Sequence, residues 1–124
     1  MPTVVDASAV LAWLQDEPGS DDVEALLMGG VIGAANWSEV LQKARQHGQP
    51  GEVVARLLAS FGLDVADVTR ADAERAAQMW AAGAGLSLGD RLCLSLGLRL
   101  EVSVATTDRR WTDVPGGPVV ILIR

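Results

Sequence analysis

The chain has 124 residues, and 16 Asp and Glu against 10 Lys and Arg give it a formal net charge of -6 at pH 7. This length accommodates one compact domain over residues 1–124 and excludes two. Hydrophobic residues make up 49% of the chain, which is enough to form a core and excludes wholesale disorder. The acidic balance argues against a generic nucleic-acid binder, because such domains usually carry excess Lys and Arg to neutralise phosphates.

The cysteine content and the apolar runs bear on where the protein resides. Cys93, the single cysteine, cannot form an internal disulfide, and its leucine-rich surroundings predict a small, buried apolar side chain. No apolar run reaches the roughly 18 residues that a membrane span needs, and the N-terminus lacks the basic region and apolar core of a secretion signal. We therefore expect a cytoplasmic protein that has no membrane partner.

The pattern along the chain alternates short apolar runs with stretches at helical spacing. In chain order, the expected strands are 3–5, 31–35, 63–68, 102–106 and 119–123. The expected helices are 9–14, 20–28, 37–46, 51–61, 70–82 and 88–100. Strands separated by helices, several of them apolar on both faces, indicate a parallel sheet between helical layers. The predicted fold class is α/β, as a three-layer α/β/α sandwich.

Several local signals mark where these elements begin or lie. Ser8 and Asn36 are expected to be N-caps of the first and third helices. Thr69–Asp72 has the pattern of a capping box, which predicts the start of the fifth helix. The 63–68 segment alternates apolar and polar residues, which predicts a half-exposed strand at an edge of the sheet.

Four acidic residues adjoin the carboxyl ends of the predicted strands. Asp6 comes directly after the first strand, and Asp108 comes shortly after the fourth. Glu39 and Asp90 lie in the first turns of the third and sixth helices. Ligands of open α/β sheets bind beyond the carboxyl ends of the strands, so we expect these carboxylates to meet at one rim.

Each of these acids also has an ordinary structural interpretation. The segments Asn36–Glu39 and Ser87–Asp90 both resemble capping boxes, and Asp6 and Asp108 suit turns or N-caps. Four carboxylates meeting on one rim would repel one another unless a cation lay among them. A carboxylate cluster without His or Cys favours Mg²⁺ or Mn²⁺ over Zn²⁺. Such an ion supports phosphoryl transfer without any histidine.

Other kinds of catalytic or binding site have little support. His47, the only histidine, falls near a helix C-terminus, which disfavours a Ser-His-Asp triad. Cys93 has no evident basic partner that would make it a thiolate. The tryptophans are expected in the core or an interface instead of on a base-stacking surface. They are Trp13, Trp37, Trp80 and Trp111.

Three arginines adjoin two of the acids. Arg91 follows Asp90, and Arg109 and Arg110 follow Asp108. One interpretation is a solvated helix or loop surface. The other is a phosphate clamp, for which the planar fork of arginine suits bidentate contacts. The pattern alone leaves both interpretations open.

In their order and spacing these motifs resemble the PIN-domain ribonucleases, and specifically the VapC-type toxins of bacterial toxin-antitoxin pairs. The matching strings cover nearly the whole chain and are Val4–Ala9, Trp37–Val40, Leu86–Arg91 and Ala105–Trp111. The resemblance implies a three-layer fold and Mg²⁺- or Mn²⁺-dependent endonuclease cleavage of RNA. It also implies a homodimer and neutralisation by a small cognate antitoxin of the VapB type.

The resemblance also implies roles for the acids. The family pattern places metal-binding, catalytic acids at Asp6, Glu39, Asp90 and Asp108. Asp6 and Asp90 are the expected direct ligands, while Glu39 and Asp108 complete or orient the hydrated ion. Some members carry a further acid shortly after the position of Asp108, whereas this chain has Arg110 two residues on.

The expected substrate contacts come from two kinds of side chain. Ser8 and Thr106 match the small polar residues that the family pattern places beside its acids. Arg91, Arg109 and Arg110 are the expected phosphate contacts. The expected reaction is in-line attack of water on an RNA phosphodiester, leaving a 5′-phosphate.

Three other classes of protein share some of these features. A signalling receiver domain also binds Mg²⁺ through carboxylates, but it requires an acidic pair after the first strand and a late lysine. Here Ala7 and Ser8 follow Asp6, and the only lysine is Lys43. A phosphatase with an aspartate nucleophile requires Asp where Ser8 stands. A catalytically silent PIN-like binding module would keep the acids for folding, and metal-dependent cleavage distinguishes the enzyme from it.

Overall fold

The computed structural model describes residues 2–123, which form a five-stranded sheet in the order β3-β2-β1-β4-β5. Every adjacent pair of strands is parallel. The strands are β1 (Val4–Val5), β2 (Val31–Gly33), β3 (Asp64–Ala66), β4 (Val104–Thr106) and β5 (Val120–Leu122). The helices are α1 (Ala7–Leu14), α2 (Ser20–Leu27), α3 (Ala34–Gln46), α4 (Gly51–Ser60), α5 (Arg70–Gln78), α6 (Leu88–Leu100) and the 3-10 helix η1 (Arg109–Asp113).

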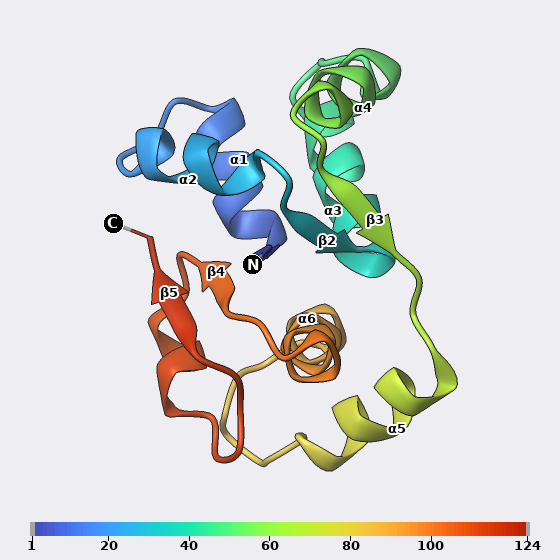
Figure 1. The fold of residues 1–124 in the computed structure, drawn as a ribbon, viewed down its shortest axis with the longest axis vertical. Helices are drawn as coiled ribbons and strands as arrows, with labels where there is room; N and C mark the ends of the chain where they lie inside the picture. The colour runs from blue at the N-terminus through green and yellow to red at the C-terminus, as the bar shows by residue number, and fades with distance from the viewer. Residues whose placement is uncertain (1, 124) are drawn as a thin grey trace.

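Helices cover both faces of the sheet, and Figure 1 shows α5 and α6 opposite α1, α2 and α4. Successive strand residues point to opposite faces, so Val5 packs with α1 to α4 and Val4 packs with α6 and η1. Trp111 of η1 is 1% exposed and closes the α6 side of the core. The predicted three-layer α/β/α sandwich with a parallel sheet is confirmed.

The capping boxes fix the starts of two helices where the sequence predicts them. In α6, the Ser87 N–H donates to Asp90 Oδ2 at 2.9 Å and the Asp90 N–H donates to Ser87 Oγ at 3.1 Å. Thr69 and Asp72 make the same reciprocal pair before α5. Helix α5 ends at Gln78, earlier than the expected Ala82, while α6 has both of its predicted ends.

Two predicted N-caps are wrong. Helix α1 starts at Ala7 after Asp6, and Ser8 lies inside its first turn. Helix α3 starts at Ala34 directly after Gly33, and Asn36 lies inside it with 1% exposure. In both places the strand passes into the helix without a loop, so the cap position falls on the last residue before the helix. The polar side chains of Ser8 and Asn36 are then available for contacts with distant segments.

Other expectations from the sequence have mixed outcomes. Strand β3 is an edge strand with Asp64 and Val65 exposed, and Cys93 is fully buried, as predicted. Trp80 is 64% exposed, so it is not a core residue. Its helix ends early, which leaves this side chain beyond the α5–α6 contact. Within residues 2–123, no helix has the length and apolar character that crossing a membrane requires.

Candidate functional site

Asp6 lies at the carboxyl end of β1, the central strand of the sheet. Its backbone N–H donates to the Ala105 carbonyl at 2.9 Å, which continues the β1–β4 ladder to the rim. The side chain is buried, with the residue 5% exposed. Oδ2 accepts hydrogen bonds from Ser8 Oγ at 2.7 Å and Thr106 Oγ1 at 2.9 Å. Within residues 2–123 these side-chain bonds all fall on Oδ2, and Oδ1 accepts no hydrogen bond.

The two hydroxyls that hold Asp6 also join β1 to the turn after β4. Ser8 Oγ accepts the Thr107 N–H at 3.1 Å, and Thr106 Oγ1 accepts the Asp108 N–H at 3.1 Å. Thr106 has no exposed surface. Its hydroxyl is therefore placed to orient Asp6, and a direct contact of Thr106 with substrate stays a prediction.

Glu39 and Asp90 lie close enough to Asp6 to affect its ionisation. Burial raises the pKa of Asp6 from its usual 3.8 to about 6, and the hydrogen bonds from Ser8 and Thr106 oppose this rise. The negative charges of Asp90 and Glu39 raise the Asp6 pKa further. The same three carboxylates, after burial itself, raise the pKa of the Cys93 thiol. The negative charges of Asp6, Glu39 and Asp90 thus act on the same region, and we call these three residues the three-acid cluster.

Asn36 links the two helices that carry Glu39 and Asp90. Its Nδ2 donates to the Gly89 carbonyl at 3.3 Å, which joins α3 to the first turn of α6. Gly89 lies against Glu39, since a Cβ at this position would be 3.6 Å from Glu39 Oε1. The sequence signal for Asn36 was present but was interpreted as an N-cap, because its partner lies far along the chain.

The three other candidate acids also have partners within the chain. Asp90 belongs to the capping box with Ser87, and Glu39 Oε2 lies 3.4 Å from Lys43 Nζ on the next turn of α3. Asp108 pairs with Arg110. In this arrangement of side chains, residues 2–123 contain no group of three or more His, Cys, Asp or Glu residues that could hold a metal ion.

Asp108 differs from the three-acid cluster in its charge environment. Its side-chain hydrogen bonds with Arg110 lower its pKa, burial opposes this, and the Arg110 N–H and charge lower it further. The negative charge of Asp108, which the sequence groups with the other three acids, is therefore neutralised by Arg110. The charges of Glu39 and Asp90 therefore act on Asp6, whereas Asp108 is paired with Arg110.

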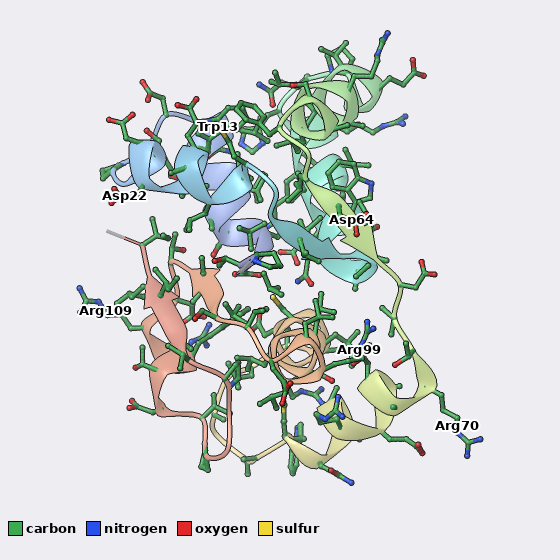
Figure 2. All side chains as sticks on the ribbon, viewed as in Figure 1. Trp13, Asp22, Asp64, Arg70, Arg99 and Arg109 are labelled. Atoms are coloured by element: carbon green, nitrogen blue, oxygen red, sulfur yellow. The ribbon has the colours of Figure 1, made fainter. Side chains whose placement is uncertain are left out.

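The three candidate arginines lie in different directions. Arg91 Nη1 donates to the Ala76 carbonyl at 2.7 Å, which fastens α6 to α5. This contact favours the solvated-or-structural interpretation of Arg91 over a phosphate clamp. Arg109 is exposed and projects outward from the β5 flank in Figure 2. Arg110 lies over the turn after β4, against Asp108 and Gly85.

The three-acid cluster fits a hard divalent cation by the chemistry of its donors. All the charged oxygens belong to carboxylates, which Mg²⁺ and Mn²⁺ prefer. Within residues 2–123 no lysine or arginine forms an ion pair with Asp6, although a buried carboxylate normally requires one. The central carboxylate therefore has both the charge and the open oxygen that a metal ion would use.

Comparisons with known proteins agree with the fold. The PIN domain family matches residues 3–117. A toxin-antitoxin complex from Klebsiella pneumoniae has a TM-score of 0.75 at 19% identity, covering 96% of this chain and 95% of that one. DNA-bound VapBC from Salmonella typhimurium has a TM-score of 0.73 at 16% identity and covers 98% of both chains. VapBC2 from Rickettsia felis, bound to a promoter DNA fragment, gives 0.73 at 11% identity over 100% of both chains. No curated protein matches the sequence.

Proposed function

The chain belongs to the PIN domain family, a family of nucleases, and from this premise we propose that it is a metal-dependent endoribonuclease and the VapC-type toxin of a toxin-antitoxin pair. The observation that carries the proposal is the buried Asp6 carboxylate, which shares its rim with Glu39 and Asp90 and has no cationic partner within residues 2–123. Such a cluster is unfavourable by itself and becomes favourable when it binds a divalent ion.

The proposed metal ligands are Asp6 and Asp90, with Glu39 orienting the hydrated ion. A bound Mg²⁺ or Mn²⁺ would supply positive charge at the phosphodiester and lower the pKa of a nearby water. Ser8 and Thr106 hold Asp6 Oδ2 by hydrogen bonds, which leaves Oδ1 without a hydrogen bond from the described residues and able to bind the ion. Asn36 keeps α3 and α6 in register through Gly89.

The proposed reaction is hydrolysis of an RNA phosphodiester. A water oxygen forms the new bond to phosphorus, the bond from phosphorus to O3′ breaks, and the product carries a 5′-phosphate. The exposed guanidinium groups of Arg109 and Arg110 supply phosphate contacts at the rim. The proposed reaction needs no histidine. His47 is exposed, and its Nδ1 lies 2.8 Å from the Lys43 carbonyl oxygen.

The proposed partner is a VapB-type antitoxin. The similar solved structures are described as toxin-antitoxin or VapBC complexes. An apolar cavity of about 470 Å³ between α1 and α4 includes Trp13, Leu14, Val53 and Leu57 in its lining, and Val53 is 53% exposed. Amphipathic helices bind in grooves of this kind. We further propose that residues 1–124 act as one domain, as a homodimer, in the cytoplasm.

The test is RNA cleavage by the purified protein, with Mg²⁺ or Mn²⁺ and with EDTA. Asp6→Asn and Asp90→Asn should each lower the rate by roughly 100-fold or more, since the metal contributes several kcal/mol to such reactions. The amide in Asp90→Asn can still accept from the Ser87 N–H, so the helix start is preserved. Asp22→Asn is the matched control, because it removes one exposed acid on the outer surface of α2 (Figure 2). An Asp90→Asn protein that cuts RNA at the wild-type rate would contradict the proposal.

A further inference from the structure

Arg110 occupies both carboxylate oxygens of Asp108. Nη2 lies 2.6 Å from Oδ2, and Nε lies 3.0 Å from Oδ1 and 3.1 Å from Oδ2. The backbone N–H of Arg110 also donates to Oδ1, at 2.9 Å. A carboxylate bonded in this bidentate way has little capacity left for a further ligand.

The guanidinium of Arg110 also contacts a second residue. Arg110 Nη1 donates to the carbonyl of Gly85, in the loop between α5 and α6, at 2.8 Å. Gly85 has φ +73°, and a Cβ at this position would collide with Arg110 Nη1. The loop can therefore close on the guanidinium because residue 85 is glycine. Asp108 and Gly85 together hold Arg110 in one orientation.

The guanidinium still has donors to offer. Its contacts within residues 2–123 leave one N–H on Nη1 and one on Nη2 without an acceptor, and the side chain is 57% exposed. Donors on neighbouring nitrogens match two oxygens of a phosphate. Its partner Asp108 is also joined to Asp6, because the Asp108 N–H donates to Thr106 Oγ1, the hydroxyl that donates to Asp6 Oδ2, so the pair lies beside the three-acid cluster.

We propose that Asp108 is a positioning residue for Arg110 and not a metal ligand, and that Arg110 binds an RNA phosphate beside the three-acid cluster. This inference rests on the proposed ribonuclease function. It replaces the expectation that Asp108 completes the metal site, because a carboxylate already neutralised by its own arginine adds little negative charge for an ion. Metal binding then depends on Asp6, Glu39 and Asp90, and phosphate binding depends on Asp108 through Arg110.

The first measurement is calorimetric titration of Mn²⁺ into the metal-free protein. Asp108→Asn should bind Mn²⁺ within about twofold of the wild type, whereas Asp90→Asn should bind at least about tenfold more weakly. An equal loss of Mn²⁺ affinity in the two variants would make Asp108 a ligand and overturn the inference. A gain of Mn²⁺ affinity in Arg110→Ala that disappears in the double variant Asp108→Asn/Arg110→Ala would also overturn it, since Asp108 would then bind the ion once Arg110 is removed.

The second measurement is the affinity for a short single-stranded RNA, by fluorescence anisotropy in EDTA. Arg110→Ala should bind roughly tenfold or more weakly, as expected for a lost charge-assisted contact, and Arg110→Lys should recover part of the loss. Asp108→Asn should weaken binding in the wild type but have little effect in an Arg110→Ala background, because it acts through Arg110. Arg70→Ala is the matched control: Arg70 pairs with Glu74 on α5, and Figure 2 shows it pointing away from the molecule.

The outcomes separate this inference from the function on which it rests. A wild-type protein that neither binds Mn²⁺ nor cleaves RNA would contradict the ribonuclease proposal itself. A wild type that cleaves RNA, combined with unchanged RNA affinity in Arg110→Ala, would contradict only the role of Arg110. Additive losses from Asp108→Asn and Arg110→Ala would show that Asp108 acts independently, and would contradict the positioning role.

Discussion

Among residues 2–123 two aspartates are buried, and their surroundings shift their pKa values in opposite directions. Asp6 is 5% exposed, and burial raises its pKa to about 6. Asp72 is 2% exposed, and its pKa is held below the usual range. Burial alone therefore does not determine how an aspartate ionises here, and the groups around each carboxylate account for the difference.

Asp72 is surrounded by donors and positive charge. Burial raises its pKa, but hydrogen bonds from the Thr69 N–H, Ser95 and Arg99 outweigh this effect. Arg99 Nε lies 3.1 Å from Oδ2 and Ser95 Oγ lies 3.0 Å from Oδ1, while Arg75 Nη1 lies 3.5 Å from Oδ1. These contacts join the start of α5 to α6. Asp72 is a structural acid whose counter-charges are supplied by the chain.

In the described part of the chain, Asp6 accepts side-chain hydrogen bonds from hydroxyl groups alone, and the charges that act on it come from other acids. The cation that would balance this cluster is not supplied by its neighbours. The comparison shows how one small protein uses two buried carboxylates differently. One stabilises the fold with arginines, and the other is the proposed ligand of an ion from solution.

The largest expected effect comes from removing the structural acid. Asp72→Ala should lower the free energy of unfolding by about 3–5 kcal/mol, because Arg75 and Arg99 lose their partner and the start of α5 loses its capping box. Urea unfolding at pH 7 measures this loss. A loss below about 1 kcal/mol would show that the Asp72 contacts do not stabilise the packing of α5 on α6.

A substitution of Asp6 in the three-acid cluster should change the free energy of unfolding in the opposite direction. In metal-free buffer at pH 7, Asp6→Asn should raise the free energy of unfolding by up to about 3 kcal/mol, because the pKa of about 6 lies well above the usual 3.8. The neutral amide oxygen can still accept from Ser8 and Thr106. A destabilisation as large as that of Asp72→Ala would remove the contrast between the two acids.

The pH dependence of stability should reveal the same contrast. The folded state binds the Asp6 proton more tightly than the unfolded state, so its stabilising contribution is complete below about pH 4 and is lost as the pH rises through about 6. Asp72 and Asp108, with lowered pKa values, contribute in the opposite sense and lose their effect as the pH falls. The advantage of Asp6→Asn over the wild type should grow by about 1 kcal/mol from pH 5 to pH 6.

Metal-free urea unfolding at several pH values measures this advantage directly. Since Asp72 and Asp108 are present in both proteins, their contributions cancel in the difference. An advantage that does not change with pH would show that the substitution acts through packing and not through ionisation.

The smallest expected effect is that of the more distant arginine. Arg75→Ala should cost less than about 1 kcal/mol, because Arg99 and Ser95 still satisfy Asp72 and the Arg75 side chain is 35% exposed. Thermal unfolding of Arg75→Ala and Arg99→Ala, measured side by side, compares the loss of stability in the two variants. A larger cost for Arg75→Ala than for Arg99→Ala would reverse the assigned order of the two contacts.

Much of the fold follows from local signals in the sequence. The ends of α6 were predicted because the Ser87–Asp90 capping box and the apolar spacing are both properties of a short segment. The rim positions of Asp6 and Asp108 follow from the strands that precede them. Ser8 and Asn36 were misinterpreted as N-caps, because their partners Thr107 and Gly89 lie far along the chain.

The directions of the arginine side chains could not be derived from spacing. Arg91 reaches the Ala76 carbonyl because α5 packs against α6, a tertiary contact with no local signal. Arg110 follows Asp108 closely in sequence, but its orientation depends on the Gly85 carbonyl of another loop. Sequence spacing identified which charged residues gather near the rim, and only the folded loops show which of them neutralise one another.

The most direct test of the central claim is the thermal unfolding midpoint at pH 7, measured with and without Mn²⁺, for the wild type, Asp6→Asn and Asp22→Asn. A ligand that binds only the folded state raises the midpoint. Mn²⁺ should raise it for the wild type and for Asp22→Asn, and should leave Asp6→Asn almost unchanged. An equal rise in all three proteins, or no rise in the wild type, would contradict a divalent-metal site at the Asp6 carboxylate.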